Sequence, residues 1–99
     1  MNYLEPWYAL PSAEAENLEH ELRREVGPRH RLQGVNVRAI ARRQDQDEVL
    51  YLLTAGSGEV AEVHLTWNEE PEAEWPRTTI YPSLTEWSRT KMAEDSALF

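Results

Sequence analysis

The chain has 99 residues and a formal net charge of -8, with 40% hydrophobic and 28% charged residues. This length allows one domain at most and disfavours a deep cofactor-holding interior, while the composition is typical of a chain that folds. The absence of Cys excludes a disulfide framework and a thiolate metal site. The negative charge disfavours nucleic acid as a partner. No apolar run is long enough for a membrane span and the first residues lack the pattern of a signal peptide, so a cytoplasmic protein is expected.

Residues 1–11 are predicted to form an aromatic N-terminal arm that docks on a single α+β domain at residues 12–99. The arm carries Trp7, and its two prolines exclude a helix. Ser12 is predicted to cap a helix that ends at the Gly-Pro pair 27–28. The apolar residues of this helix recur at intervals of three and four, so they share one face: Ala15, Leu18, Leu22 and Val26.

Three strands with short turns between them follow, which predicts an antiparallel meander. Residues 35–42 alternate between apolar and polar, residues 49–53 are apolar on both faces as in a central strand, and residues 61–67 alternate again. The turns are predicted at residues 44–47 and at Gly56-Ser57-Gly58. In the first strand, one face carries Val35, Val37, Ala39 and Ala41.

The apolar faces of the helix and strands are predicted to form one core, because these periodic faces have nowhere else to go. Trp67 continues the alternation of the third strand and is assigned to this core. The full set is Leu18, Leu22, Val35, Val37, Leu53, Val63, Leu65 and Trp67.

An acidic loop at 68–76, a short strand at 78–81 and a C-terminal helix from Leu84 to about Asp95 complete the predicted fold. Ser83 and Glu86 have the spacing of a capping box, in which the Ser side chain accepts from an amide three residues on. The predicted fold class is α+β, with an N-terminal helix, a three- to four-stranded antiparallel meander sheet and a C-terminal helix.

Positive charge is concentrated in one segment: seven of the nine Arg lie between residues 23 and 43, where Glu25 is the only acid. These guanidinium groups either pair with acids of the same chain or form a patch for an anion or an acidic partner. Alternation predicts Arg38 and Arg42 on one face of the first strand, with Arg43 at the turn. The acids expected across the strands are Glu48, Glu59 and Glu62.

Two tryptophans, Trp7 and Trp75, each lie beside a proline in an irregular segment. Such rings either close the ends of a small core or anchor a partner. Together with Arg38, Arg42 and Arg43 they are the interaction candidates.

His64 is the weak candidate for catalysis, because a strand places it beside Glu62 on the polar face of the sheet, where an imidazole and a carboxylate can exchange protons. The alternative is an exposed histidine on a solvated face. No His pair has the spacing of a metal site, and Ser57 lacks the flanking residues of a phosphate-binding loop. Neither a metal nor a cofactor is predicted.

One set of residues, spread over about positions 15–95, has the pattern of a known family. It consists of Val63-His64-Leu65-Thr66-Trp67, Trp75-Pro76, Ser83, Glu86-Trp87, Met92 and Asp95, preceded by Arg42-Arg43, Asp45, Asp47 and Val49-Leu50-Tyr51-Leu52. This pattern resembles a family of small bacterial proteins of unassigned function, with an HLTW strand and a C-terminal helix that contains EW. The resemblance implies a bacterial, cytoplasmic single domain and implies no chemistry.

The sequence therefore predicts a non-enzymatic bacterial protein-interaction module, immunity- or adaptor-like by analogy only. Its partner is expected to be another protein and neither nucleic acid nor a membrane, and a homodimer is left open. The alternative is a small enzyme or ligand-binding domain that uses the polar sheet face around His64 and Glu62. A concave, partly enclosed pocket at His64 would favour this alternative, and a flat exposed patch would favour the interaction module.

Overall fold

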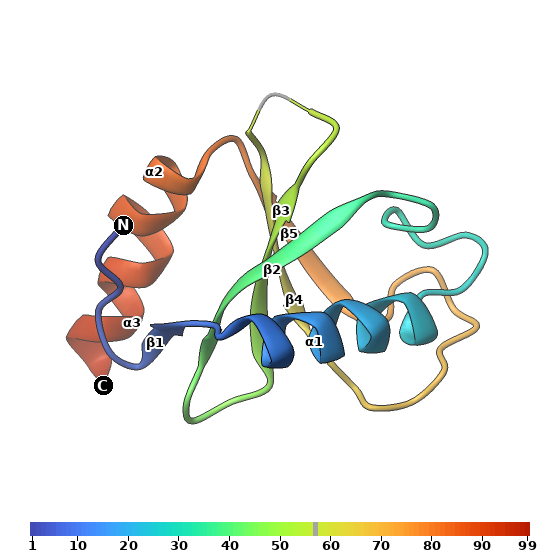
Figure 1. Cartoon of the computed structure of the whole chain (residues 1–99), viewed down its shortest axis with the longest axis horizontal. Coiled ribbons are helices and arrows are strands. Elements are labelled where there is room, and N and C mark those ends of the chain that lie inside the picture. The colour runs from blue at the N-terminus through green and yellow to red at the C-terminus, as the bar shows by residue number, and fades with distance from the viewer. Residues whose placement is uncertain (57) are drawn as a thin grey trace.

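A five-stranded antiparallel sheet forms the centre of the molecule in a computed structural model that describes residues 1–56 and 58–99 (Figure 1). Each strand pairs with its neighbours in sequence, in the order β1-β2-β3-β4-β5. The strands are β1 (Trp7–Ala9), β2 (Val37–Arg43), β3 (Glu48–Leu53), β4 (Val60–His64) and β5 (Arg77–Tyr81). The predicted hairpin between β3 and β4 includes Ser57, which lies outside the described residues.

Helices lie against both faces of the sheet, so the fold is of the predicted α+β class. α1 (Ser12–Glu25) covers one face. The C-terminal helix covers the other and consists of α2 (Leu84–Trp87), the π-helical stretch η1 (Ser88–Met92) and α3 (Ala93–Leu98) (Figure 1). Within the described residues, no helix is long and apolar enough to cross a membrane.

The fifth strand comes from the predicted N-terminal arm. β1 pairs antiparallel with the end of β2, with Trp7 opposite Arg43 and Ala9 opposite Ala41. Only three residues pair, and Pro6 and Pro11 bound the segment. A strand this short has no visible period in the sequence, which is why the prediction of three or four strands was too low.

Each helix begins with a different kind of cap. Ser83 accepts a hydrogen bond from the Glu86 amide (3.0 Å), which confirms the predicted cap of the C-terminal helix. At α1 the predicted cap is wrong: Ser12 is the first helical residue, and Pro11 holds the cap position without a side-chain hydrogen bond. The Pro11 carbonyl accepts the first helical hydrogen bond from Ala15 (2.9 Å), because proline enters with an extended backbone and leaves its carbonyl free.

The core between α1 and the sheet contains most of the residues predicted for it. Leu18, Leu22, Val63 and Leu65 are buried there. Val35, Val37 and Leu53 are half-buried and pack against the same core. Burial of these aliphatic side chains is the main driving force for docking α1 onto the sheet.

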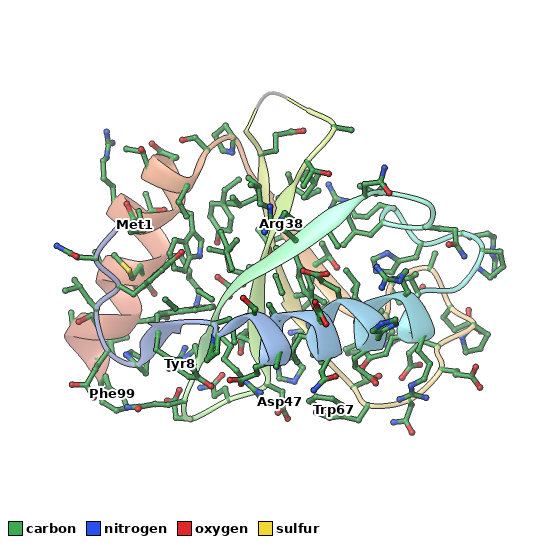
Figure 2. The ribbon with its side chains drawn as sticks, in the orientation of Figure 1. Met1, Tyr8, Arg38, Asp47, Trp67 and Phe99 are labelled. Carbon is green, nitrogen blue, oxygen red and sulfur yellow. The ribbon has the colours of Figure 1, made fainter. Side chains whose placement is uncertain are left out.

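Trp67 does not belong to this core. Its side chain is 44% exposed, and its backbone adopts a positive φ of 63°. Figure 2 shows it at the periphery of the molecule. The alternation fails here because β4 ends at His64 and the chain then turns, so a pattern that continues in the sequence no longer describes a strand.

β2 contains an irregularity that reverses the faces of its second half. Ala39 pairs with Tyr51, but Ala41 pairs with the next residue, Leu50, so one extra residue lies in β2. Consequently Ala39 packs on the α1 side and Ala41 on the side of the C-terminal helix. The prediction that all four apolar residues of this strand share one face is wrong beyond Ala39.

Candidate functional site

The same irregularity separates two of the predicted interaction residues. Arg38 lies opposite Leu52, which packs beneath the C-terminal helix, whereas Arg42 lies opposite Val49 on the α1 side. Arg38 and Arg42 therefore point to opposite faces of the sheet. The predicted double-arginine patch on one face does not form, because the extra residue of β2 shifts the alternation between them.

Arg42 and Arg43 are paired within the chain. Arg42 forms an ion pair with Glu14 (3.1 Å), and its other nitrogen lies 3.9 Å from Asp47. Arg43 contacts Asp45 (2.9 Å) and Asp95 (3.3 Å). These acids come from α1, the β2–β3 turn and the C-terminal helix.

The three acids predicted across the strands are not the partners of these arginines. Glu48 pairs with His64 and Glu62 pairs with Lys91. No salt bridge of the described residues involves Glu59. For Arg42 and Arg43, the simpler of the two interpretations, internal pairing, is the correct one.

Glu62 is buried beneath the C-terminal helix, with 7% of its surface exposed. It accepts a hydrogen bond from the Trp87 indole (2.9 Å) and lies 3.3 Å from the Lys91 ammonium. Burial raises the pKa of Glu62, while Trp87 and Lys91 oppose the rise. The predicted pair with His64 therefore does not form, because the helix covers Glu62 and leaves His64 in the open.

Trp7 is also buried beneath this helix, with 1% of its surface exposed. Its indole donates to Asp95 (2.8 Å), and its ring packs edge-on against Trp87 with centroids 4.9 Å apart. Lys91 donates to the same Asp95 carboxylate (2.7 Å). Trp7 thus closes the core, which is one of its two predicted roles, and it offers no surface to a partner.

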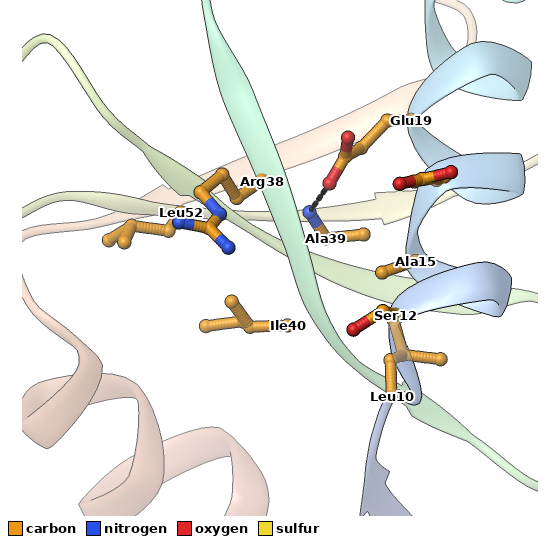
Figure 3. A pocket seen from close by; sticks show the side chains of 9 residues that line it. Leu10, Ser12, Ala15, Glu19, Arg38, Ala39, Ile40 and Leu52 are labelled. Carbon is orange, nitrogen blue, oxygen red and sulfur yellow. Dashed lines mark hydrogen bonds between the residues drawn. The ribbon is translucent and has the colours of Figure 1, made fainter.

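A groove of about 550 Å³ runs along β2, between α1 and the sheet edge (Figure 3). Arg38 is exposed in it and has no carboxylate within 4.0 Å among the described residues. We call it the Arg38 groove; it is lined by Leu10, Ser12, Ala15, Glu16, Glu19, Arg38, Ala39, Ile40 and Leu52.

The Arg38 groove exposes part of the backbone edge of β2. β1 pairs only with residues 41–43, so the strand's first half has no neighbouring strand in the described part of the chain. The Ala39 amide points outward and donates to the Glu19 carboxylate (3.0 Å), which Figure 3 shows reaching across from α1. Because alternate residues of a strand direct their backbone amide and carbonyl to the same side, the amide and carbonyl of Val37 face the same open edge as the Ala39 amide.

A second cleft, of about 400 Å³, lies at one end of the sheet; we call it the Trp75 cleft. Its centre is a row of three residues in register across neighbouring strands, Glu48 opposite His64 and His64 opposite Arg77. His64 Nδ1 lies 3.4 Å from the Glu48 carboxylate, and the Arg77 guanidinium lies over the Trp75 ring, 5.2 Å from its centroid. The lining residues are Gln46, Glu48, His64, Trp75 and Arg77.

The loop that carries Trp75 is fixed at its start by a buried carboxylate. Glu25, at the end of α1, accepts from the Thr66 and Trp67 amides (2.8 Å each). Its own carbonyl accepts from the Glu70 amide (3.0 Å). Burial and a hydrogen bond with Glu21 raise the pKa of Glu25 to about 7, against the effect of the two amides.

The loop is fixed at its end by a buried histidine. His30 Nδ1 accepts from the Leu32 amide (3.0 Å), so the hydrogen lies on Nε2, which donates to the Pro76 carbonyl (2.8 Å). The backbone of Gly27 lies directly against the loop, since a Cβ at this position would be only 2.6 Å from the Glu70 carbonyl oxygen. The loop is therefore held against α1 and its following turn at both ends.

Sequence reasoning placed His64 and Trp75 but missed their neighbours. Glu48 and Arg77 join them only through the strand register, which the sequence does not specify. Arg77 had one available signal, its position two residues after Trp75 and directly after Pro76. Glu19 gave no signal, because a glutamate on a helix is ordinary until its strand neighbour is known.

Comparisons of this chain with protein-family profiles, with curated proteins and with solved structures find no match. The resemblance to small bacterial proteins of unassigned function stays a prediction. In the residues that the structure describes, no group of three or more His, Asp or Glu is arranged to hold a metal ion. Any functional conclusion therefore depends on the two clefts and the residues that line them.

Proposed function

We propose that this protein is a protein-interaction module that binds an extended segment of another protein along the open edge of β2. The observation that carries the proposal is the half-strand Val37 to Ala39 inside the Arg38 groove, whose outer backbone edge pairs with no strand of the described residues; the free edge ends where the Leu10 amide donates to the Ile40 carbonyl (3.2 Å). Exposed strand edges are templates for pairing with another chain, and many peptide-binding domains use them in this way. An immunity- or adaptor-like role would need a surface of this kind, by analogy only.

Glu19 has a specific part in this proposal. Its carboxylate occupies the place that the carbonyl of a neighbouring strand would take at the Ala39 amide. A side chain that covers one edge amide protects a free sheet edge from aggregation. On binding, the carbonyl of the incoming segment would replace the Glu19 carboxylate, and Val37 would supply the next backbone contact.

The lining of the groove indicates the chemistry of the incoming segment. Side chains of an added strand alternate between the two faces of the sheet. On one face they would meet Arg38, Ile40 and Leu52, which fit an acidic or apolar side chain. On the other they would meet Ala15 and the acids Glu16 and Glu19, which fit a small or basic one.

The test is affinity capture from the native host with three variants. Val37→Pro removes an amide that faces the open edge, which the sheet tolerates because that amide makes no ladder hydrogen bond. Arg38→Glu reverses the charge in the groove. Arg31→Glu is the matched control, since Arg31 is exposed, has no carboxylate partner in the described residues and lies outside the groove.

We expect the wild type and Arg31→Glu to retain the same partner, and Val37→Pro and Arg38→Glu to lose it, with all melting temperatures within a few degrees of each other. Retention of that partner by Val37→Pro at wild-type level would refute strand addition at this edge.

A second candidate function is a ligand-binding domain on the sheet face around His64. The Trp75 cleft, which contains His64, favours it. Glu62, the other residue predicted for this site, does not, since it is buried beneath the C-terminal helix.

A further inference from the structure

Arg77 contacts an exposed aromatic ring and has no acidic partner among the described residues. Its guanidinium lies over the ring of Trp75, which is 37% exposed. This cation–π contact does not occupy the N–H donors of the guanidinium, which remain available to an acceptor. Although the chain has 18 acids, no carboxylate lies within 4.0 Å of Arg77 among the described residues.

The acidic loop beside Arg77 does not neutralise it. Of the four glutamates in residues 69–74, only Glu72 forms an ion pair in the described structure, and its partner is Arg29 at 4.0 Å. A stacked guanidinium with free donors is the group that binds carboxylate or phosphate in a bidentate manner. Arg77 is thus oriented for an oxyanion that the chain itself does not supply.

The neighbours of Arg77 complete a small polar site. His64 lies directly across the strand pair, and its Nδ1 faces Glu48, which leaves Nε2 for a ligand. The Gln46 side chain lines the cleft and carries two further donors. A cleft of about 400 Å³ is of the size that holds a small molecule.

The site is also held in place before any ligand arrives. Pro76, between Trp75 and Arg77, is fixed by the buried His30, and the start of the loop is fixed by Glu25. A fixed backbone lowers the conformational entropy that binding would otherwise remove. Trp75 and Arg77 therefore form a platform on an ordered part of the chain.

We propose that the Trp75 cleft binds the carboxylate or phosphate group of a small molecule, with Arg77 as the principal contact, Gln46 as an additional donor and His64 as part of the cleft wall. This inference rests on the second candidate function, for which it names the ligand chemistry, and it is independent of the interaction proposed for the Arg38 groove.

The proposal is tested by titrating the ¹⁵N-labelled protein with four probes that share one ring and differ in charge. Benzoate and phenyl phosphate carry the two oxyanions, benzamide is neutral and benzamidine is cationic. The readout is the NMR shift of the backbone amides, the Arg77 Nε–H and the Trp75 indole N–H. The variants are Arg77→Gln, Arg77→Lys and, as the matched control, Arg31→Gln.

We expect saturable shifts confined to the Trp75 cleft with benzoate or phenyl phosphate, and the stronger of the two identifies the preferred oxyanion. Arg77→Gln should weaken that binding at least about tenfold, Arg77→Lys should also weaken it because Lys neither stacks nor binds in a bidentate manner, and Arg31→Gln should leave it unchanged.

The proposal would be overturned by shifts at arginines throughout the surface, by equal binding to Arg77→Gln, or by equal responses to benzamide or benzamidine. Absence of saturable shifts with both oxyanions would overturn it as well.

Discussion

The two faces of the sheet are held to their helices by different means. On the α1 face the core is mainly aliphatic, and its one buried carboxylate, Glu25, lies at the end of the helix against backbone amides, with no cation within 4.0 Å in the described residues. On the opposite face two buried carboxylates, Glu62 and Asp95, are balanced by Lys91 and Arg43.

The two faces therefore stabilise a buried carboxyl group in two different ways. Glu25 is stabilised by amide donors and retains a proton up to near neutral pH, because burial and Glu21 raise its pKa to about 7. Glu62 and Asp95 are each stabilised by ion pairs and by a hydrogen bond from a tryptophan indole, Trp87 for Glu62 and Trp7 for Asp95. The charged arrangement also joins distant segments, since it links the N-terminal strand and the C-terminal helix to the centre of the sheet.

The largest effect is expected from Asp95→Ala. Asp95 accepts hydrogen bonds from Trp7 and Lys91 and forms an ion pair with Arg43, so its removal leaves a buried indole N–H and two cations without their shared partner. The free energy of unfolding should fall by about 3–5 kcal/mol. Denaturant unfolding measures this, and Asp95→Asn is the control, because it keeps an acceptor for Trp7 and should lose less. Equal losses in both variants would show that the indole hydrogen bond contributes little.

Leu65→Ala tests the aliphatic face in the same assay. Leu65 is 1% exposed in the core beneath α1, and its truncation leaves a cavity there. The free energy of unfolding should fall by about 2–5 kcal/mol. Unlike the Asp95 variants, this loss should not change with salt concentration, because no charge is involved. If the stability loss of Leu65→Ala changed clearly with salt, the aliphatic core would be coupled to the ion pairs on the opposite face.

The smallest expected effect is on the pH dependence of the free energy of unfolding, which tests the raised pKa of Glu25. The pKa of Glu25 is about 7 in the folded protein and near 4.5 when unfolded, so between these values the folded state holds a proton that the unfolded state lacks. The free energy of unfolding should therefore decrease as the pH rises from about 4.5 to 7, by up to about 3 kcal/mol.

Glu25→Gln should reduce this slope without removing it, because burial also raises the pKa of Glu62. Urea unfolding at several pH values measures the slope, and Leu65→Ala serves as a destabilised control that keeps the wild-type slope. A Glu25→Gln protein with an unchanged slope would assign the pH dependence to other groups.

Local patterns were sufficient for most of the fold. The intervals of three and four in residues 15–26 predicted α1 and its buried face, and the spacing of Ser83 and Glu86 predicted the cap that the structure shows. The alternation through Val63 and Leu65 placed β4 in the core. These predictions succeed because period and capping depend on residues within a few positions of each other.

The predictions that failed depended on contacts between distant segments. Trp67 continued the alternation of its strand, but Glu25, 42 residues earlier, binds the amide of Trp67 where the chain turns outward. Arg38 and Arg42 matched in period, but pairing with β3 inserts one extra residue between them. Neither the hydrogen bond to Trp67 nor the extra residue in β2 can be predicted from the neighbouring sequence.

The sequence by itself determined every helix and strand except β1, the α+β class and the cap of the C-terminal helix, since these follow from local spacing. Only the tertiary structure decided the candidate sites. The row Glu48, His64 and Arg77 exists because three strands pair in one register, and the Arg38 groove exists because β1 is too short to cover β2. Strand register and the coverage of a sheet edge depend on how distant segments pack together, so the sequence of a single segment does not determine them.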